Sequence, residues 1–477
     1  MDDTSAAIVG FVDGLTVDRI TDRTARATGA RLVDSLGCAI AAIDSEPARI
    51  ARRMAAMASG PLPATAIGMS EPTTPELAAF ANTVMVRYLD CNDMYFTARG
   101  GGGHPSDLIP TALAVGQATG ASGAEVVRSI VLGYEVNGAL ASTVWLRERG
   151  WDQGLNVVAA ASMMAGSLLG LSRDELGHAL SLAVTANVPV RQTRVGHLSM
   201  WKGCATAGAV RNGIFAALLA REGMTGPPSP YEGSSGIWEQ VTGPFEIHLP
   251  VDGDSFVIED IHTKTRPAEY NAQGPIDLIE DLRGRVRLED VEAIEVDTYR
   301  LTFHEIGSGE AKWAPTTRET ADHSLPYLVA VALIDGYVDE RSCSPERVGD
   351  PAVLRVMQKI SIRERPEFTA RFPAELPNEI RIRVTGGEVV AAAGSFPRGH
   401  RRNPISDAEL DAKFDRMIAG RSARDRDTCE TVRARAWSAW ELPAIDELVL
   451  PLGSLEVHDE SSTAAPGSPG QVPSHVG

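Results

Sequence analysis

The sequence is poor in cysteine, in lysine and in long apolar runs. The shortage of cysteine and the shortage of apolar runs each exclude a class of protein. Its five cysteines lie far apart without a CxxC or Cys/His spacing, which excludes a zinc-binding or disulfide-stabilised scaffold. Unpaired thiols are typical of the cytoplasm, where we expect the protein. No run of about eighteen apolar residues occurs, so we expect no membrane-spanning helix. The acidic start, MDDTSAAIVG, lacks the basic residues of a signal peptide.

Positive charge is also in short supply. The formal net charge of −18 at pH 7 argues against nucleic acid and anionic membranes as partners, although a small anion can still bind where basic residues gather. The motifs of common cofactors are missing too: there is no GxGxxG after a strand, no phosphate loop, no HExxH and no GxSxG. We therefore expect neither a metal nor a cofactor.

The hydrophobic pattern changes along the chain, from helical periodicity to strand-like alternation and back. Helical patterns dominate the first half, with capping boxes at Ser122 and Ser172 and further helices over 74–88 and 204–221. After about residue 260, alternating segments such as VEAIEVDTY, ISIRE and EIRIRV predict strands, and TGG between two of them indicates a hairpin. Helical patterns return after a third capping box, at Ser406.

These patterns predict a mainly α protein with an inserted α+β domain. Residues 1–260 and 401–454 would form a large all-helical domain built from both chain ends, and residues 261–400 a smaller domain. The end of the chain, 455–477, is rich in Ser, Pro and Gly and has little to bury, so we expect a disordered tail.

The segment LDCNDMYFTARGGGGHPSDLIP concentrates groups that transfer protons. It places Asp90, Asp93 and His104 within fifteen residues, on either side of Gly100–Gly103. The glycines are expected to bend closely around a ligand or to act as a hinge. Taken alone, the segment is as compatible with an acidic, glycine-rich surface loop.

Lysine is rare enough to be informative, with five lysines against forty arginines. Lys202 lies in a basic segment, RQTRVGHLSMWKG, which also contains Arg191 and Arg194. Lys264 lies at the predicted junction of the helical and α+β domains. Domain junctions often hold ligand clefts. Either ammonium could bind a carboxylate or transfer a proton, or be a chance surface lysine.

Three further positions have a structural and a functional interpretation. Glu269 could be an acid/base group or could pair with Arg266. Asp322 and His323 could cap the following apolar helix, LPYLVAVALID, or face a cleft. His304 is expected in a strand, without a function.

Taken together, four segments resemble the MmgE/PrpD family. LDCNDMYF…HPSDLIP, SMWKGCATAGAVRNG, KTRPAEYNAQGPIDL and RETADHSLPYLVAVALIDG occur in the family's order between residues 80 and 336. The resemblance implies a homodimer, with a cofactor-free pocket between a helical domain and an α+β lid. It implies pocket acids at Asp93 and Asp90, a histidine at His104 and a lysine at Lys264, while Lys202 matches the WK of the dehydratase-like branch.

The resemblance and the residues together give a set of candidates. Asp93, His104, Lys202 and Lys264 are the predicted catalytic residues. The predicted substrate-binding residues are Asp90, Thr97, Arg194, Arg266, Glu269, Tyr270 and His323.

Within the family, the segments SMWKG and AEYNAQ resemble those of the 2-methylcitrate dehydratases. Decarboxylase-like members resemble KPxHxG near position 200 and have a histidine at the place of Glu269. Two departures from the dehydratases touch the expected pocket: Met94 replaces a threonine, and Gly100–Gly103 replace bulkier residues.

The expected activity is metal-free elimination of water from 2-methylcitrate or a similar hydroxy-tricarboxylate by general acid/base catalysis. Decarboxylation of cis-aconitate and epimerisation of an amino- or imino-dicarboxylate are the alternative reactions. A dimer that only binds carboxylates is the alternative outside enzymes.

Overall fold

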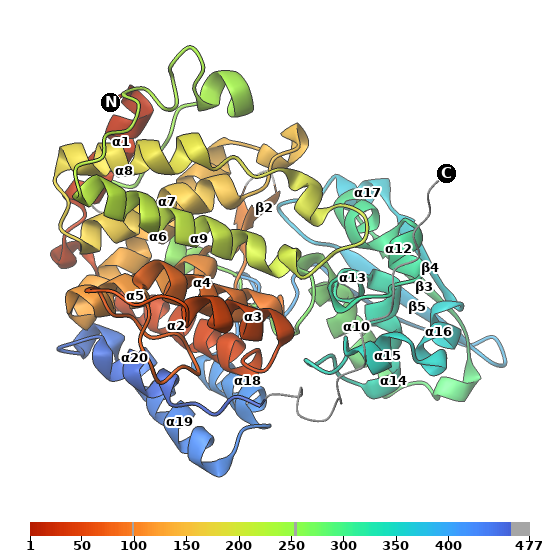
Figure 1. Cartoon of the computed structure of the whole chain (residues 1–477). Helices are drawn as coiled ribbons and strands as arrows, with labels where there is room; N and C mark the ends of the chain where they lie inside the picture. Colours follow the sequence, from red (N-terminus) through yellow and green to blue (C-terminus); the bar gives the residue numbers. More distant parts are fainter. Residues whose placement is uncertain (98–99, 252–254, 459–477) are drawn as a thin grey trace, which may run out of the picture.

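The computed structural model describes residues 1–97, 100–251 and 255–458, and it consists mainly of helices with one small mixed sheet (Figure 1). The predicted mainly helical class is therefore confirmed. Most of the predicted tail, 459–477, lies outside the described residues. Its first residues are packed: Leu455 is buried, and the His458 amide donates to Asp44. The start of the tail at residue 455 was thus placed too early.

The larger hydrophobic core takes its side chains from residues 8–261 and 410–455, so both ends of the chain contribute to it. The helices of this part are α1 (Asp3–Gly14), α2 (Asp22–Ala41), α3 (Glu46–Ala55), α4 (Pro75–Tyr88), α5 (Ile109–Thr119), α6 (Gly123–Thr143), α7 (Gly154–Leu168), α8 (Arg173–Ala186), α9 (Trp201–Arg221), α18 (Asp407–Ile418), α19 (Ala423–Trp437) and α20 (Asp446–Gly453). We call this part the helical unit.

Local sequence sets where these helices begin. The three predicted capping boxes are present: the hydroxyls of Ser122, Ser172 and Ser406 accept from the amide three residues on, and the glutamate there bonds back. Pro75 occupies the first turn of α4, where its missing N–H costs nothing. The α4 and α9 bounds agree with the predicted ranges to within three residues.

The second core takes its side chains from residues 268–390, and we call this part the sheet unit. Its strands are β3 (Val291–Thr298), β4 (Ile360–Glu364), β5 (Asn378–Val384) and β6 (Val389–Gly394), in the order β4-β3-β5-β6. β3 and β4 are parallel and the other pairs antiparallel. Its helices are α10 (Gln273–Arg283), α11 (Arg300–Thr302), α12 (Glu310–Trp313), α13 (Arg318–Ala321), α14 (Leu325–Asp335), α15 (Pro345–Val348), α16 (Pro351–Met357) and α17 (Pro366–Thr369).

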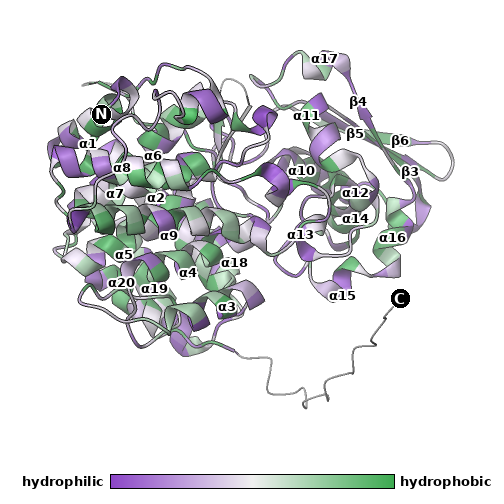
Figure 2. Ribbon diagram, turned by 45° about the horizontal axis from the view of Figure 1, so that its top comes forward, coloured by the Kyte–Doolittle hydropathy of each residue, from purple (hydrophilic) through white to green (hydrophobic). Residues whose placement is uncertain are grey.

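Alternation along the strands explains how the sheet unit packs. Ile294 and Val296 of β3 are fully buried and lie opposite Ile382 and Ile380 of β5. The helices α10 and α14 contact the strands, and α14 is strongly apolar (Figure 2). The predicted hairpin turn is present, with Gly386 and Gly387 both at positive φ.

The glycine run does not form the surface loop that the sequence also allowed. Gly100–Gly103 is a strand, β2, paired with β1 (Tyr95–Thr97). Close approach explains the glycines at its end: a Cβ on Gly102 would lie 2.7 Å from the Tyr95 ring, and one on Gly103 would lie 2.6 Å from Gln153 Oε1.

Helix α9 is long and apolar enough to cross a membrane by length and composition alone. However, 61% of its most apolar window is buried, and the helix packs against α4, α7 and α8. This packing accounts for its composition without a membrane.

A buried lysine connects the C-terminal segment to the rest of the helical unit. The ammonium of Lys413 in α18 donates to Asp34 Oδ1 of α2 (2.5 Å), to the Cys91 carbonyl (2.8 Å) and to the Lys264 carbonyl (2.7 Å). It therefore fixes two segments that carry candidate site residues.

Lys413→Met should reduce stability strongly, because it leaves the buried Asp34 without a cation. We expect the free energy of unfolding to fall by about 3–5 kcal/mol, seen as a lower thermal midpoint. Adding Asp34→Asn should recover part of the loss. Lys359→Met, which removes a single bond to the Val291 carbonyl, is the control. Equal effects of the two lysine variants would contradict this account.

Candidate active site

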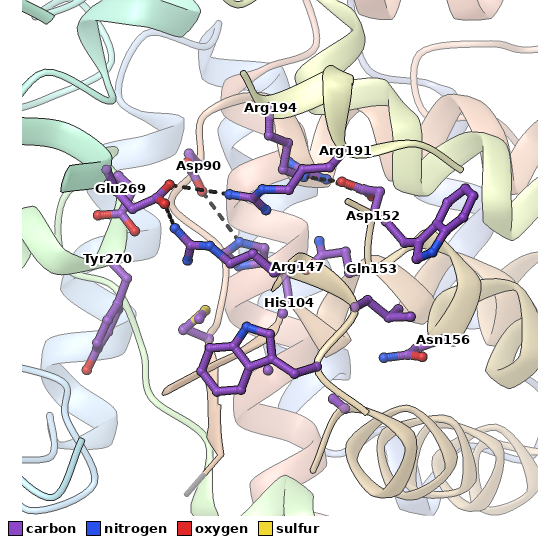
Figure 3. Close-up of a pocket in the computed structure, with 18 of the residues that line it drawn as sticks. Asp90, His104, Arg147, Asp152, Gln153, Asn156, Arg191, Arg194, Glu269 and Tyr270 are labelled. Carbon is purple, nitrogen blue, oxygen red and sulfur yellow. Dashed lines mark hydrogen bonds and ion pairs between the residues drawn. The ribbon is translucent and has the colours of Figure 1, made fainter. Parts of the chain in front are cut away.

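A cavity of about 170 Å³ is lined by residues of both units, among them His104, Arg191 and Glu269 (Figure 3). The helical unit contributes the segments around residues 87–104, 141–156 and 191–194. Lys264, which precedes the second core, lines the cavity together with Glu269, Tyr270, Glu305 and His323 of the sheet unit. The volume suits a small metabolite, since drug-sized ligands occupy about 300–1,000 Å³.

Asp90 is at the centre of the ionic contacts. Its carboxylate accepts from Arg87 (2.5 Å), Lys264 (2.5 Å) and Lys202 (3.1 Å), all of them buried. Burial would raise the pKa of Asp90, but the charges of Arg87, Lys202 and Lys264 outweigh it and hold the pKa well below its usual range. Asp90 is also the one non-glycine residue with positive φ (52°) in the described part of the chain. Such strain persists where surrounding contacts enforce it, often at functional sites.

His104 is held in one tautomer. Its Nδ1 lies 2.6 Å from the carbonyl oxygen of Asp93, which can only accept, so Nδ1 carries the proton. Burial lowers the pKa of His104 well below its ordinary value, and the charges of Arg87 and Lys264 lower it further. The ring is therefore neutral at pH 7, and its Nε2, 3.9 Å from Asp90 Oδ1, has a free lone pair in the cavity. This nitrogen can act as a base.

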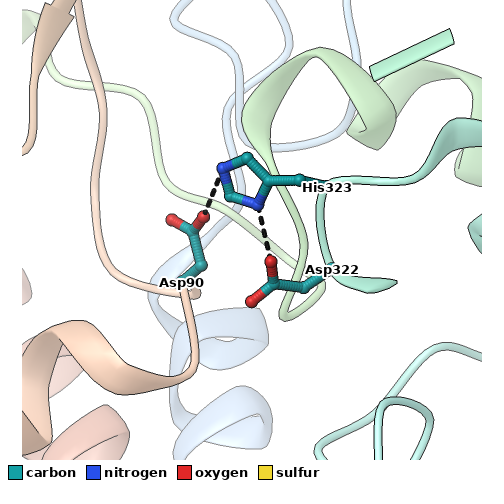
Figure 4. Close-up of side chains that lie close together, drawn as sticks. All are labelled: Asp90, Asp322 and His323. Atoms are coloured by element: carbon teal, nitrogen blue, oxygen red, sulfur yellow. Dashed lines mark hydrogen bonds and ion pairs between the residues drawn. The ribbon is translucent and has the colours of Figure 1, made fainter. Parts of the chain in front are cut away.

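His323 approaches Asp90 from the sheet unit. Its Nδ1 lies 2.5 Å from Asp322 Oδ1 and its Nε2 3.6 Å from Asp90 Oδ2 (Figure 4). Burial and the charge of Lys202 lower the pKa of His323 to about 4. The helix α14 is capped by Ser324, so the capping role considered for Asp322 and His323 is wrong.

The spacing of Asp90, Asp322 and His323 could hold a metal ion. However, the Lys202 ammonium lies 3.1 Å from an oxygen of each carboxylate and so already supplies a cation to both. Carboxylates that are neutralised by lysine and arginine have little charge left for a metal. The donor set therefore does not fit a resident metal.

Lys202 does not reach the cavity. It is 1% exposed, does not line the cavity wall, and bridges Asp90 and Asp322 from behind. Lys202 therefore links the helical unit to the segment between α13 and α14, and its predicted catalytic role stays a prediction.

Asp93 is also turned away from the cavity. One carboxylate oxygen accepts from the Ser106 amide and hydroxyl, and the other accepts from the Tyr134 hydroxyl at 2.8 Å. The predicted proton transfer by this carboxylate is therefore replaced by the role of its carbonyl, which orients His104.

Lys264, Glu269 and Tyr270 do line the cavity. Burial lowers the pKa of Lys264, although Asp90 opposes the shift, and burial raises the pKa of Glu269. Both Glu269 oxygens accept from Asn271, and the Tyr270 hydroxyl lies 2.6 Å from His262 Nδ1.

Two predicted binding residues lie elsewhere. Arg266 forms a bidentate pair with Glu280, not with Glu269, and stacks on Tyr337. Thr97 belongs to β1 and does not line the cavity. His304 is in η9 (Phe303–Gly307), a π-helical turn, rather than in a strand.

Arg194 lines the cavity, and so do two arginines that are not among the predicted residues. Arg147 of η3 (Leu146–Arg149) and Arg191 of η4 (Arg191–Arg194) line the cavity with Asp152 and Glu305. The basic character of the segment around Arg191 was a usable signal, whereas Arg147 has no distinctive neighbours in the sequence.

Comparison with known proteins gives the family. The model of the MmgE/PrpD N-terminal domain matches residues 6–250, and that of the C-terminal domain matches residues 267–439. The chain belongs to the MmgE/PrpD family.

Three characterised relatives show which activities occur at this distance. The chain is 28% identical to 2-methylcitrate dehydratase of Cupriavidus necator, over 84% of this chain and 87% of the relative. It is 28% identical to 2-methylcitrate dehydratase of Salmonella typhimurium, over 86% and 90%. It is 24% identical to cis-aconitate decarboxylase of Mus musculus, over 96% and 94%.

Lys202→Met should raise the pKa of His323 from about 4 towards its ordinary 6.5, because a lowering charge is lost and the Asp322 carboxylate beside the ring loses its ammonium partner. Histidine NMR titration, with His323→Gln to assign the signal, measures the shift. Lys359→Met should leave the value unchanged. A His323 pKa that stays near 4 in Lys202→Met would refute the coupling.

Proposed function

We propose that this chain is a cofactor-independent hydro-lyase that removes water from 2-methylcitrate or a similar hydroxy-tricarboxylate. The observation that carries the proposal is the neutral His104, whose free Nε2 shares a cavity with the Lys264 ammonium. The two 2-methylcitrate dehydratases above, matched over most of their length, support the choice of substrate. Met94 and Gly102, at the two departures from the dehydratases, line the cavity, so a related tricarboxylate fits the proposal equally.

In the proposed reaction, His104 Nε2 takes the proton from the carbon next to a carboxylate. The electron pair of that C–H bond forms the double bond as the C–O bond breaks. Lys264 gives a proton to the departing hydroxyl, which leaves as water; its lowered pKa favours this transfer. The site is restored when His104 loses its proton and Lys264 regains one.

The electrostatics of the cavity support an anionic substrate. Arg147, Arg191 and Arg194 line it together with Lys264, on a chain whose overall charge is −18. Cations placed before the reaction lower the cost of charge that develops beside a carboxylate. Under this proposal the sheet unit serves as a lid, because the cavity takes Glu269, Tyr270, Glu305 and His323 from it.

Decarboxylation of cis-aconitate is the second candidate, because the mouse decarboxylase matches the largest share of this chain among the three relatives above. The same cavity would stabilise a carbanion formed by loss of CO₂ and then protonate it. Proton NMR of the products from 2-methylcitrate and cis-aconitate distinguishes the two reactions, and incubation of an imino-dicarboxylate tests epimerisation.

His104→Ala should lower kcat for 2-methylcitrate by about 10²–10⁴-fold, as expected for loss of a general base. Absorbance of the conjugated product measures the rate, and circular dichroism checks the fold. His197→Ala removes an exposed histidine that does not line the cavity and should retain the wild-type rate. A His104→Ala enzyme with wild-type kcat would exclude the assignment.

We also propose that the chain acts as a homodimer. Trp201 and Phe215 lie fourteen positions apart along α9 and are each about half exposed (51% and 53%), and Met200, next to Trp201, is 41% exposed. Apolar side chains that gather on one exposed face mark interfaces. Light scattering should give about twice the 50.8 kDa of one chain, and Phe215→Glu should shift the mass towards the monomer. An unchanged dimer would place the interface elsewhere.

A further inference from the structure

Three arginines in the outer part of the cavity form ion pairs with only two carboxylates. Arg194 is paired with Asp152, with 2.6 Å between Nε and Oδ2. Arg147 and Arg191 both form an ion pair with Glu305. Glu269 also lines the cavity, but its two oxygens accept from Asn271. Three guanidinium groups are thus ion-paired with two carboxylates, and the three arginine side chains lie close together in Figure 3.

The shared carboxylate comes from the other unit. Arg147 and Arg191 belong to the helical unit, whereas Glu305 lies on η9 in the sheet unit. In the described part of the chain, the Glu305 carboxylate contacts only these two arginines, and its side chain is 35% exposed. It therefore has little holding it in place apart from the arginines.

We propose that Glu305 is a displaceable counterion, which yields Arg147 and Arg191 to a substrate carboxylate remote from the reacting carbon. A ligand carboxylate offers guanidinium the same two oxygens as glutamate does, so the exchange conserves the hydrogen bonds. Burial, followed by the charges of Arg147 and Arg194, lowers the pKa of Arg191 to about 10, because the three guanidinium groups lie close together.

The inference rests on the proposed function in one respect, namely that the ligand is a tricarboxylate. A substrate whose reacting end lies between His104 and Lys264 would place a further carboxylate at the arginines. Glu305 would then set whether the cavity prefers ligands with three carboxylates to ligands with two. Release of Glu305 from the arginines would be coupled to movement between the two units.

Binding of an unreactive tricarboxylate tests the inference without turnover. Isothermal titration calorimetry would use tricarballylate, with glutarate as the dicarboxylate. Glu305→Gln should bind tricarballylate at least fivefold more tightly than wild type, because the arginines lose their competitor. Arg191→Gln should bind it at least tenfold more weakly and prefer it less over glutarate. If Arg191→Gln does not fold, Arg147→Gln provides the same measurement from the other cation.

Glu310→Gln is the matched control, since it removes an exposed glutamate of the same unit. It should bind tricarballylate like wild type. Unchanged or weaker binding by Glu305→Gln, or no binding of tricarballylate by wild type, would overturn the inference. Failure of the proposed function looks different: 2-methylcitrate would not be dehydrated, while the affinities of the variants still followed the expected order.

Discussion

The candidate site depends on one buried carboxylate. The Asp90 carboxylate accepts hydrogen bonds from Arg87, Lys202 and Lys264. The residue is 1% exposed, and its main chain has an unfavourable positive φ. A buried charge network is stable only when every member has a partner, because an unpaired ion in a low-dielectric interior costs several kcal/mol. Asp90 therefore fixes the cations around it as much as they fix Asp90, and the positions of both lysines follow from it.

The network also joins the two cores. Lys202 starts α9 in the helical unit and reaches Asp322 in the sheet unit, while Lys264 receives a bond on its carbonyl from Lys413 near the C-terminus. Segments from four regions of the chain thus meet at one carboxylate. A cavity at this junction combines an inner end, where His104 and Lys264 are held by buried partners, with an outer end where Arg147 and Arg191 pair with the partly exposed Glu305.

Lysine and arginine occupy different parts of the cavity and its surroundings. The protein uses arginine almost everywhere, yet three of its five lysines are buried at or beside the site. A compact ammonium can donate to three acceptors around a point, as Lys413 does, whereas planar guanidinium suits paired carboxylates, as Arg194 does with Asp152. The scarcity of lysine in the sequence was therefore a useful signal of position, although not of contact with substrate.

Local sequence patterns were enough to predict most elements and the region of the candidate site. Helix starts follow from capping residues within one turn, and strands from period-two alternation, because both depend on near neighbours. The sequence also singled out His104, Lys264, Glu269, Tyr270, Arg194 and His323, all of which line the cavity. Which way each remaining side chain points was decided only by tertiary structure. Asp93 faces Tyr134, Arg266 faces Glu280, and Lys202 meets Asp322 at a separation of 120 residues. The partners of Arg147 and Arg191 likewise come from a segment more than a hundred residues away, because ion pairs form between groups that packing brings together and no local pattern encodes that distance.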